Sequence, residues 1–162
     1  MPLTLVMHWL HLLAMVVVLG GYLFLSFFLW PTLRELDAEV RLQVRLLGRL
    51  LRRFFTVVVV ALMVEILTGG LYLLPATVAA GQGSGALAAF YRLLLVKLGL
   101  VFVALLLVPL QLFGLGFRLT RMDAGVAPFD AAAAQRVMRR LQGVSLLIAA
   151  LLTAVVLLST RL

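Results

Sequence analysis

Residues 10–30 read LHLLAMVVVLGGYLFLSFFLW, and this stretch contains no Lys, Arg, Asp or Glu. As an α-helix it is long enough to cross the hydrocarbon core of a bilayer, which takes roughly 20 residues. The whole chain shares this character, because 65% of its 162 residues are hydrophobic and only 12% are charged. A soluble domain averages about 45–50% apolar and about 25% charged residues. The composition therefore predicts an integral membrane protein and excludes both a water-soluble globule and a disordered chain.

Three further apolar runs follow the first, so we expect an all-α integral membrane four-helix bundle that forms a single domain. Pro31 and Pro75 are expected to end the first two spans, because proline lacks an N–H group and collides with the preceding turn. Pro109 is expected to kink the third span, and Asp130 to cap the helix that leads into the fourth. The Gly- and Ala-rich segment 79–89 predicts a loop. The domain covers residues 1–162, and its spans lie at about 3–30, 54–74, 90–117 and 137–160.

The distribution of positive charge predicts how the chain lies in the membrane. The formal net charge is +8, and six arginines lie in segment 31–53 and five in segment 118–140, both between apolar runs. Basic connections stay on the cytoplasmic side. Both segments are therefore expected on the cytoplasmic side of a bacterial inner membrane, with the N- and C-termini in the periplasm. A nucleic-acid partner is excluded because no soluble face remains to display the charge, and zero Cys excludes disulfides and thiolate metal sites.

The first basic segment has the pattern of an amphipathic helix. Thr32 and Glu35 have the spacing of a capping box, so a new helix is expected to begin there. This helix is expected either to lie in the membrane interface or to extend the second span into the cytoplasm. Its basic face predicts contact with anionic lipid headgroups, and the alternative is a docking surface for a partner subunit. The apolar face comprises Leu33, Leu36, Val40, Val44, Leu47 and Leu51, and the basic face Arg34, Arg41, Arg45, Arg49 and Arg52.

Ionisable residues inside the spans are the main functional signal. His11 lies near the outer end of the first span, Glu65 near the middle of the second, and Lys97 within the third, with Arg92 close to the outer interface. Such residues are costly in a membrane and face a bundle interior or a cavity. We expect them to converge in one pocket below the outer leaflet. The structural alternatives are a simple Glu65–Lys97 ion pair and an interfacial anchor at Arg92.

Two histidines and two methionines share one face of the first span. At about 100° per residue, and with Met7 at 0°, His11 lies at about 40°, Met15 at about 80° and His8 at about 100°. Thioether and imidazole groups suit Cu(I). A neutral imidazole can equally be an axial ligand of haem iron. The alternatives are that the histidines only bond neighbouring helices and that the methionines only fill the core. The pairs Gly20–Gly21 and Gly69–Gly70 would admit a close backbone or a flat macrocycle.

Several segments resemble the small membrane proteins of the copper-resistance D (CopD) type. They are LHLLAMVVVLGGYLFLSFFLWPTLREL at 10–36, RLLRRFF at 49–55 and YRLLLVKLGLVFVALLLVPLQLFGLGFR at 91–118. His11 with Gly20 nine residues later, and Lys97 in a K-L-x-L-V context, match the family pattern. A weaker likeness connects the chain to HemJ-type protoporphyrinogen oxidases, which bind b-type haem. The sequence departs from both patterns, because Val108-Pro109-Leu110-Gln111 lacks their third-span His and Val18 replaces an aromatic residue.

The sequence and this resemblance together lead to three functional hypotheses. The first is a CopD-like protein that handles copper at a periplasmic-side site with Met7, His8, His11 and Met15 as ligands. The second is a HemJ-like b-type haem protein that works in electron transfer or porphyrinogen oxidation, with His11 as an axial ligand and Lys97 or Arg92 near the propionates. Its second axial ligand would be Met15, Met63 or a His of a second protomer. The third is a cofactor-free accessory subunit that packs against a larger membrane complex. The partner proteins expected are a second copy in a homodimer or such a complex, and no motif of a hydrolase or kinase is present.

Overall fold

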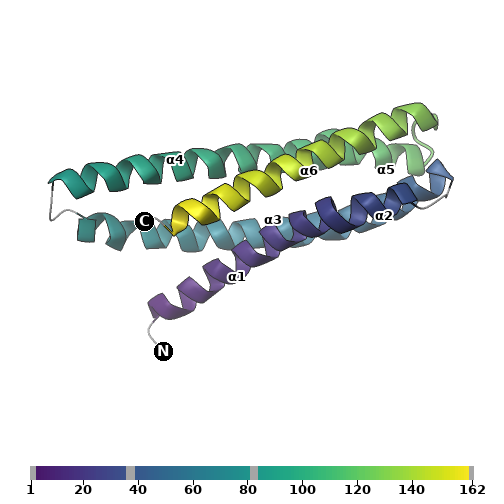
Figure 1. Cartoon of the computed structure of the whole chain (residues 1–162). Coiled ribbons are helices and arrows are strands. Elements are labelled where there is room, and N and C mark those ends of the chain that lie inside the picture. The colour runs from purple at the N-terminus through teal and green to yellow at the C-terminus, as the bar shows by residue number, and fades with distance from the viewer. Residues whose placement is uncertain (1–2, 36–38, 81–83, 161–162) are drawn as a thin grey trace.

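The computed structural model of the chain describes residues 3–35, 39–80 and 84–160, and these are helical with no β-strand. Four long rods run side by side, and the chain reverses direction from each to the next (Figure 1). The first rod is α1 (Leu3–Phe24), the π-helix η1 (Leu25–Leu29) and α2 (Trp30–Glu35), and the second is α3 (Val40–Ala80). The third rod is α4 (Ser84–Pro109), the π-helix η2 (Leu110–Gly116) and α5 (Phe117–Asp123), and the fourth is α6 (Ala131–Ser159).

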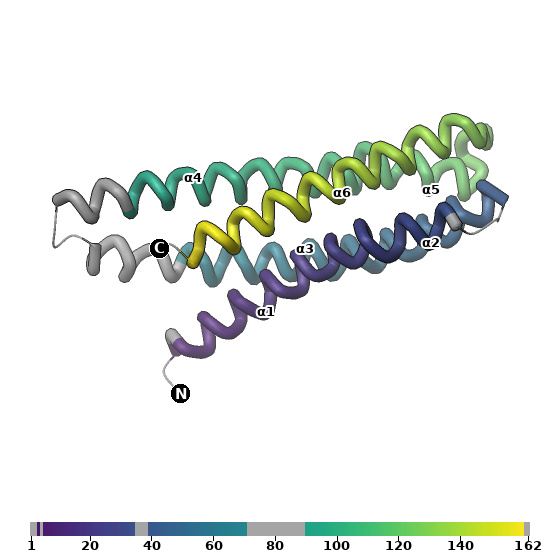
Figure 2. The backbone as a smooth tube through the Cα atoms, viewed as in Figure 1, coloured from purple at the N-terminus to yellow at the C-terminus, as the bar shows by residue number. Residues whose placement is uncertain are grey.

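Three of these rods are long and apolar enough to cross a membrane. They extend over Leu5–Arg34, Phe90–Asp123 and Ala131–Ser159. The predicted second span, about 54–74, lies in α3, and its side chains from residue 71 onward are outside the described residues. Figure 2 traces the same path and shows α3 continuing unbroken from the arginine-rich segment into this span. The helical character predicted from composition is therefore confirmed for the described residues, and three helices could span a membrane.

The expected stops at proline residues were wrong. Pro31 lies inside α2, and α3 continues through Pro75 to Ala80. Membrane helices tolerate proline because local changes of helix type satisfy the freed backbone groups. Such a change precedes Pro31, where the N–H of Trp30 donates to the carbonyl of Leu25, five residues earlier. At Pro109, where a kink was predicted, the helix also changes type, because the π-helix η2 begins directly after this residue.

Two further local predictions also need correction. The capping box at Thr32 does not form, because Thr32 lies within α2 and its hydroxyl donates to the carbonyl of Phe28 at 2.7 Å. Because the helix continues through Thr32, the carbonyl one turn earlier is within reach of its hydroxyl, and no helix begins there that a side chain could cap. Segment 79–89 is not a loop throughout, because it includes the end of α3 and the start of α4. The cap at Asp130 is confirmed, since its carboxylate accepts the N–H of Ala132 at 2.9 Å.

The core contains one fully buried polar chain. Tyr22 of α1 donates its hydroxyl to the side-chain oxygen of Gln111 in η2 at 3.2 Å. The amide nitrogen of Gln111 donates to the hydroxyl of Ser145 in α6 at 2.7 Å. All three side chains have a relative exposure of 0%. Apolar residues surround this chain, and α1 packs mainly on α3 while α4 packs mainly on α6. Hydrogen bonds between spans thus join three of the four rods.

The arginine-rich end of the bundle has its own contacts. Val44, Leu47 and Leu51 of α3 are buried. On the exposed side, the guanidinium of Arg41 lies 5.5 Å from the ring centre of Phe129. The side chain of Arg45 lies 3.4 Å from the carboxylate of Asp123.

Candidate functional site: a histidine–carboxyl pair between two spans

His11 is directed toward α3 by its place on the packed face of α1. Ala14, three residues later, and Val18, seven residues later, are both buried in the core. Residues three, four and seven apart lie on the same face of a helix. Because α1 packs mainly on α3, the imidazole meets α3 while remaining half-buried, with 26% of its side chain exposed.

The imidazole ring contacts Glu65, Thr68 and Gly69, which lie within about one turn of α3. Its Nε2 lies 3.2 Å from Oε1 of Glu65, and its Nδ1 lies 3.0 Å from the hydroxyl oxygen of Thr68. Gly69 leaves room for the ring, because a Cβ placed there would lie 3.1 Å from Cε1 of His11. Both ring nitrogens therefore have a partner on α3, and the ring packs against the backbone at Gly69.

The hydrogen bonds limit where the protons can lie. The hydroxyl of Thr68 has one hydrogen, and its shortest contact is with the carbonyl of Val64 at 2.6 Å. When the hydroxyl donates to Val64, the Thr68 oxygen accepts from Nδ1 of His11, and Nδ1 carries a hydrogen. In that arrangement, a proton between Nε2 and Oε1 of Glu65 belongs to one of the two groups. The pair is either imidazolium with carboxylate or neutral imidazole with carboxylic acid.

The surroundings of Glu65 include an unpartnered carboxylate oxygen and a lysine. Oε2 is buried and has no hydrogen-bond partner among the described residues. Lys97, half-buried on α4, interacts electrostatically with Glu65 and with His11. Unpartnered buried carboxylate oxygens are costly. The site thus has one cationic side chain nearby and one free acceptor position.

The structure brings together only part of the predicted site. His11 and Glu65 are in contact, and Lys97 interacts electrostatically with both. Met15 is partly buried and packs against the core, and Met7 is partly exposed one turn before His11. The residues predicted from the sequence that lie on the exposed surface are His8, Arg92 and Met63. Among the described residues, no three or more His, Asp or Glu side chains cluster as metal ligands.

The sequence did not identify Thr68 as a partner of His11, and the close approach expected at Gly69 is made by the imidazole and not by a backbone or a macrocycle. Their positions three and four residues after Glu65 put them on one face of α3, which was a usable signal. The spacing of these residues alone did not show that this face of α3 packs against His11. The buried partners Tyr22 and Ser145 were missed for the same reason, since pairing across helices depends on how the rods pack.

No known protein family, curated protein or solved structure matches this chain.

Proposed function

We propose that the chain is a four-span protein of the bacterial inner membrane, with both termini in the periplasm, that handles copper in the periplasmic half of the bundle. His11 is the central ligand. The His11–Glu65 pair holds one proton at rest and releases it when Cu(I) binds. This retains the CopD-like expectation and replaces its four-residue ligand set with one built around His11.

The observation that carries the proposal is the contact between Nε2 of His11 and Oε1 of Glu65 at 3.2 Å, a distance at which the two groups can hold one proton between them. A metal ligand must be deprotonated, so metal binding to such a pair releases a proton. Oε2 of Glu65 is a free acceptor that can take a new partner when Oε1 lets go of His11. The pair is therefore able to exchange its proton for Cu(I), and the negative charge of Glu65 stays compensated.

The side chains around His11 suit Cu(I) better than Zn²⁺. Met7 and Met15 lie one turn before and one turn after His11 on α1, and i, i+4 neighbours have Cβ atoms about 5–6 Å apart. Thioethers select soft Cu(I), which imidazole also accepts. Zinc prefers four nitrogen, sulfur or carboxylate ligands, and the described residues offer no cluster of that kind. His8 is exposed and is left out of the ligand set.

Copper titration in the presence of a chromophoric Cu(I) chelator tests the proposal on the purified protein. Wild type should bind one equivalent and release about one proton, and its apparent affinity should rise as pH rises because protons compete with the metal. His11→Ala should abolish binding. His8→Ala is the matched control and should leave binding unchanged, because it alters the other histidine of the same helix. Equal binding by wild type and His11→Ala would contradict the proposal.

A second candidate is proton transfer without a metal. It is favoured by the complete hydrogen bonding of the His11 ring, which needs no further ligand. In this case no copper would bind at stoichiometric levels. An infrared C=O band of a protonated carboxylic acid would appear in wild type as pH falls and would be missing from Glu65→Gln.

The remaining hypotheses receive less support from the geometry. The space at Gly69, where the sequence predicted room for a flat macrocycle, is already filled by the imidazole. A visible spectrum of the same reduced sample tests for haem. Co-purification of other membrane proteins in mild detergent, with no stoichiometric metal, is the result expected of an accessory subunit.

A further inference from the structure

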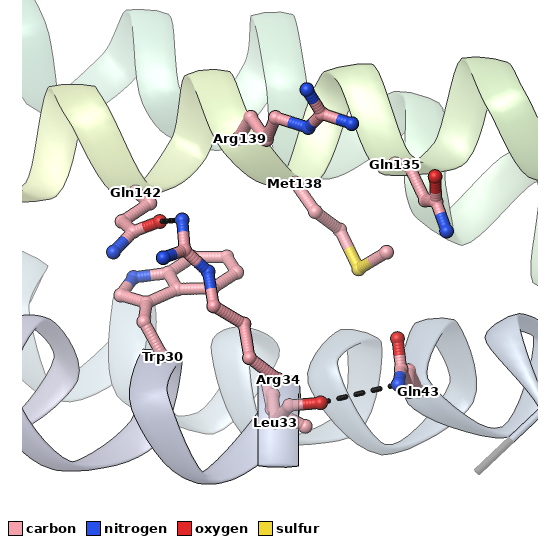
Figure 3. Close-up of a pocket in the computed structure, with 8 residues that line it drawn as sticks. All are labelled: Trp30, Leu33, Arg34, Gln43, Gln135, Met138, Arg139 and Gln142. Atoms are coloured by element: carbon pink, nitrogen blue, oxygen red, sulfur yellow. Dashed lines mark hydrogen bonds between the residues drawn. The ribbon is translucent and has the colours of Figure 1, made fainter. Parts of the chain in front are cut away.

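A second polar site lies at the opposite, arginine-rich end of the bundle. A cavity of about 410 Å³ opens there between α2, α3 and α6. In Figure 3, Trp30 and Arg34 of α2 and Gln43 of α3 lie across from Gln142, Met138 and Gln135 of α6. Arg139 also lines the cavity, and its side chain runs along the outer side of α6. Cavities of roughly 300–1,000 Å³ are the usual size of small-molecule sites. This cavity is unrelated to the His11–Glu65 pair, which lies near the other end of α1.

The lining of the cavity is rich in hydrogen-bond donors and cationic. It includes two guanidinium groups and three side-chain amides, and none of the described residues that line it is acidic. Arg34 donates one N–H to the side-chain oxygen of Gln142, and Gln43 donates to the carbonyl of Leu33 at 3.1 Å. A guanidinium has five N–H donors, so most of those on Arg34 remain for another acceptor. Two like charges around one cavity favour an anionic occupant.

Trp30 gives the cavity a buried aromatic wall. Its side chain is only 3% exposed, and it lines the cavity. Its indole N–H is enclosed by protein atoms and has no hydrogen-bond partner in the part of the chain that the structure describes. An occupant of the cavity therefore meets the indole ring and not this donor.

We infer that this cavity binds the phosphate group of an anionic phospholipid, with phosphatidylglycerol as the representative headgroup. Guanidinium groups recognise phosphate through paired, charge-assisted hydrogen bonds. The cavity lies where the apolar stretch Leu5–Arg34 ends, and lipid phosphates lie at this boundary between chain and water. Trp30 and Leu33 add an apolar wall that fits the glycerol part of a lipid. A free phosphate ion would leave this wall unused.

Native mass spectrometry of the full chain tests the inference. The protein is released from mixed micelles with equal amounts of phosphatidylglycerol and phosphatidylcholine. Wild type should retain one phosphatidylglycerol in preference to phosphatidylcholine. Arg34→Gln and Arg139→Gln should each weaken this retention about tenfold, in line with the loss of a hydrogen bond to a charged group. Arg118→Gln is the matched control, because Arg118 is exposed on α5 and does not line the cavity.

Fluorescence provides a readout inside the cavity itself. The chain has two tryptophans, so Trp9→Phe leaves Trp30 as the only reporter. Its emission should change on addition of phosphatidylglycerol, and not on addition of phosphatidylcholine or excess inorganic phosphate.

Three results would overturn the inference. The first is equal retention of the two lipids by wild type. The second is unchanged retention in the double variant of Arg34 and Arg139 when circular dichroism shows that it is folded. The third is displacement of the lipid by inorganic phosphate at equal concentration, which would indicate a soluble phosphate as the occupant.

Discussion

His11 reaches Glu65 because the residue facing its ring on α3 has no side chain. A Cβ at Gly69 would lie 3.1 Å from Cε1 of His11, which is tighter than ordinary van der Waals contact, whereas a Cβ at Gly70 would meet nothing within 4 Å. The two neighbouring glycines therefore have different roles. Gly69 accommodates the ring, and no close contact requires a glycine at position 70.

Replacing each glycine by alanine should separate these roles. Gly70→Ala should raise the free energy of unfolding by about 0.5–1 kcal/mol, because alanine favours helix over glycine. Gly69→Ala should lose this gain and weaken copper-coupled proton release, because the ring is bonded at both nitrogens and cannot move without lengthening one bond. Unfolding in denaturing detergent, followed by circular dichroism, measures the first effect. Equal stabilisation by both substitutions would contradict the close packing of His11 on Gly69.

At the scale of elements, a single glutamine joins three rods. Gln111 accepts from Tyr22 of α1 and donates to Ser145 of α6, and all three side chains are fully buried. It lies in η2, the π-helix that follows Pro109. π-Helical turns often occur at functional sites, and this one carries the side chain that connects the rods.

A double-mutant cycle measures this connection. Gln111→Leu should lower the free energy of unfolding by about 1–3 kcal/mol, because it leaves the buried hydroxyl of Tyr22 without an acceptor. Tyr22→Phe combined with Gln111→Leu should cost less than the sum of the two single changes, with a coupling of about 1 kcal/mol. Denaturant unfolding of the four proteins provides the values. Strict additivity would mean that the Tyr22–Gln111 hydrogen bond contributes nothing to stability.

At the scale of the whole molecule, charge is concentrated at one end. Eleven of the 14 Lys and Arg residues lie in segments 31–53 and 118–140. These segments form the α2–α3 and α5–α6 ends of the rods, which lie together in Figure 1. Excess positive charge on one side sets membrane orientation. With the proposed orientation, the His11–Glu65 pair and the cavity lined by Arg34 and Arg139 would lie toward opposite sides of the bilayer.

Cysteine labelling tests this orientation directly, because the chain has no native cysteine. Thr160→Cys lies at the exposed end of α6, and Ala124→Cys lies in the exposed turn after α5. On intact spheroplasts, a membrane-impermeant maleimide should label Thr160→Cys and not Ala124→Cys. Permeabilised membranes are the control, in which both should react. The reverse pattern would place the His11–Glu65 pair in the cytoplasmic half of the membrane.

Much of the fold could be predicted from composition and periodicity, and the errors share one cause. The helices that lie in the predicted spans follow from long apolar runs, and the cap at Asp130 follows from local chemistry. The predictions at Pro31, Pro75 and Thr32 failed because local rules for soluble helices were applied where the membrane-spanning rods continue. At Pro31 a wider, π-helical turn directly before the proline accommodates the missing hydrogen bond.

The candidate site shows the same division. That His11, Glu65 and Lys97 face the bundle interior could be inferred from the sequence, because the cost of an ionisable group in lipid depends on the residue alone. Which groups meet depended on the register of α1 against α3 and of α2 against α6. A shift of one residue turns a side chain by about 100°. Only packing therefore determined that His11 meets Thr68 and Gly69 and that Arg34 and Arg139 line one cavity.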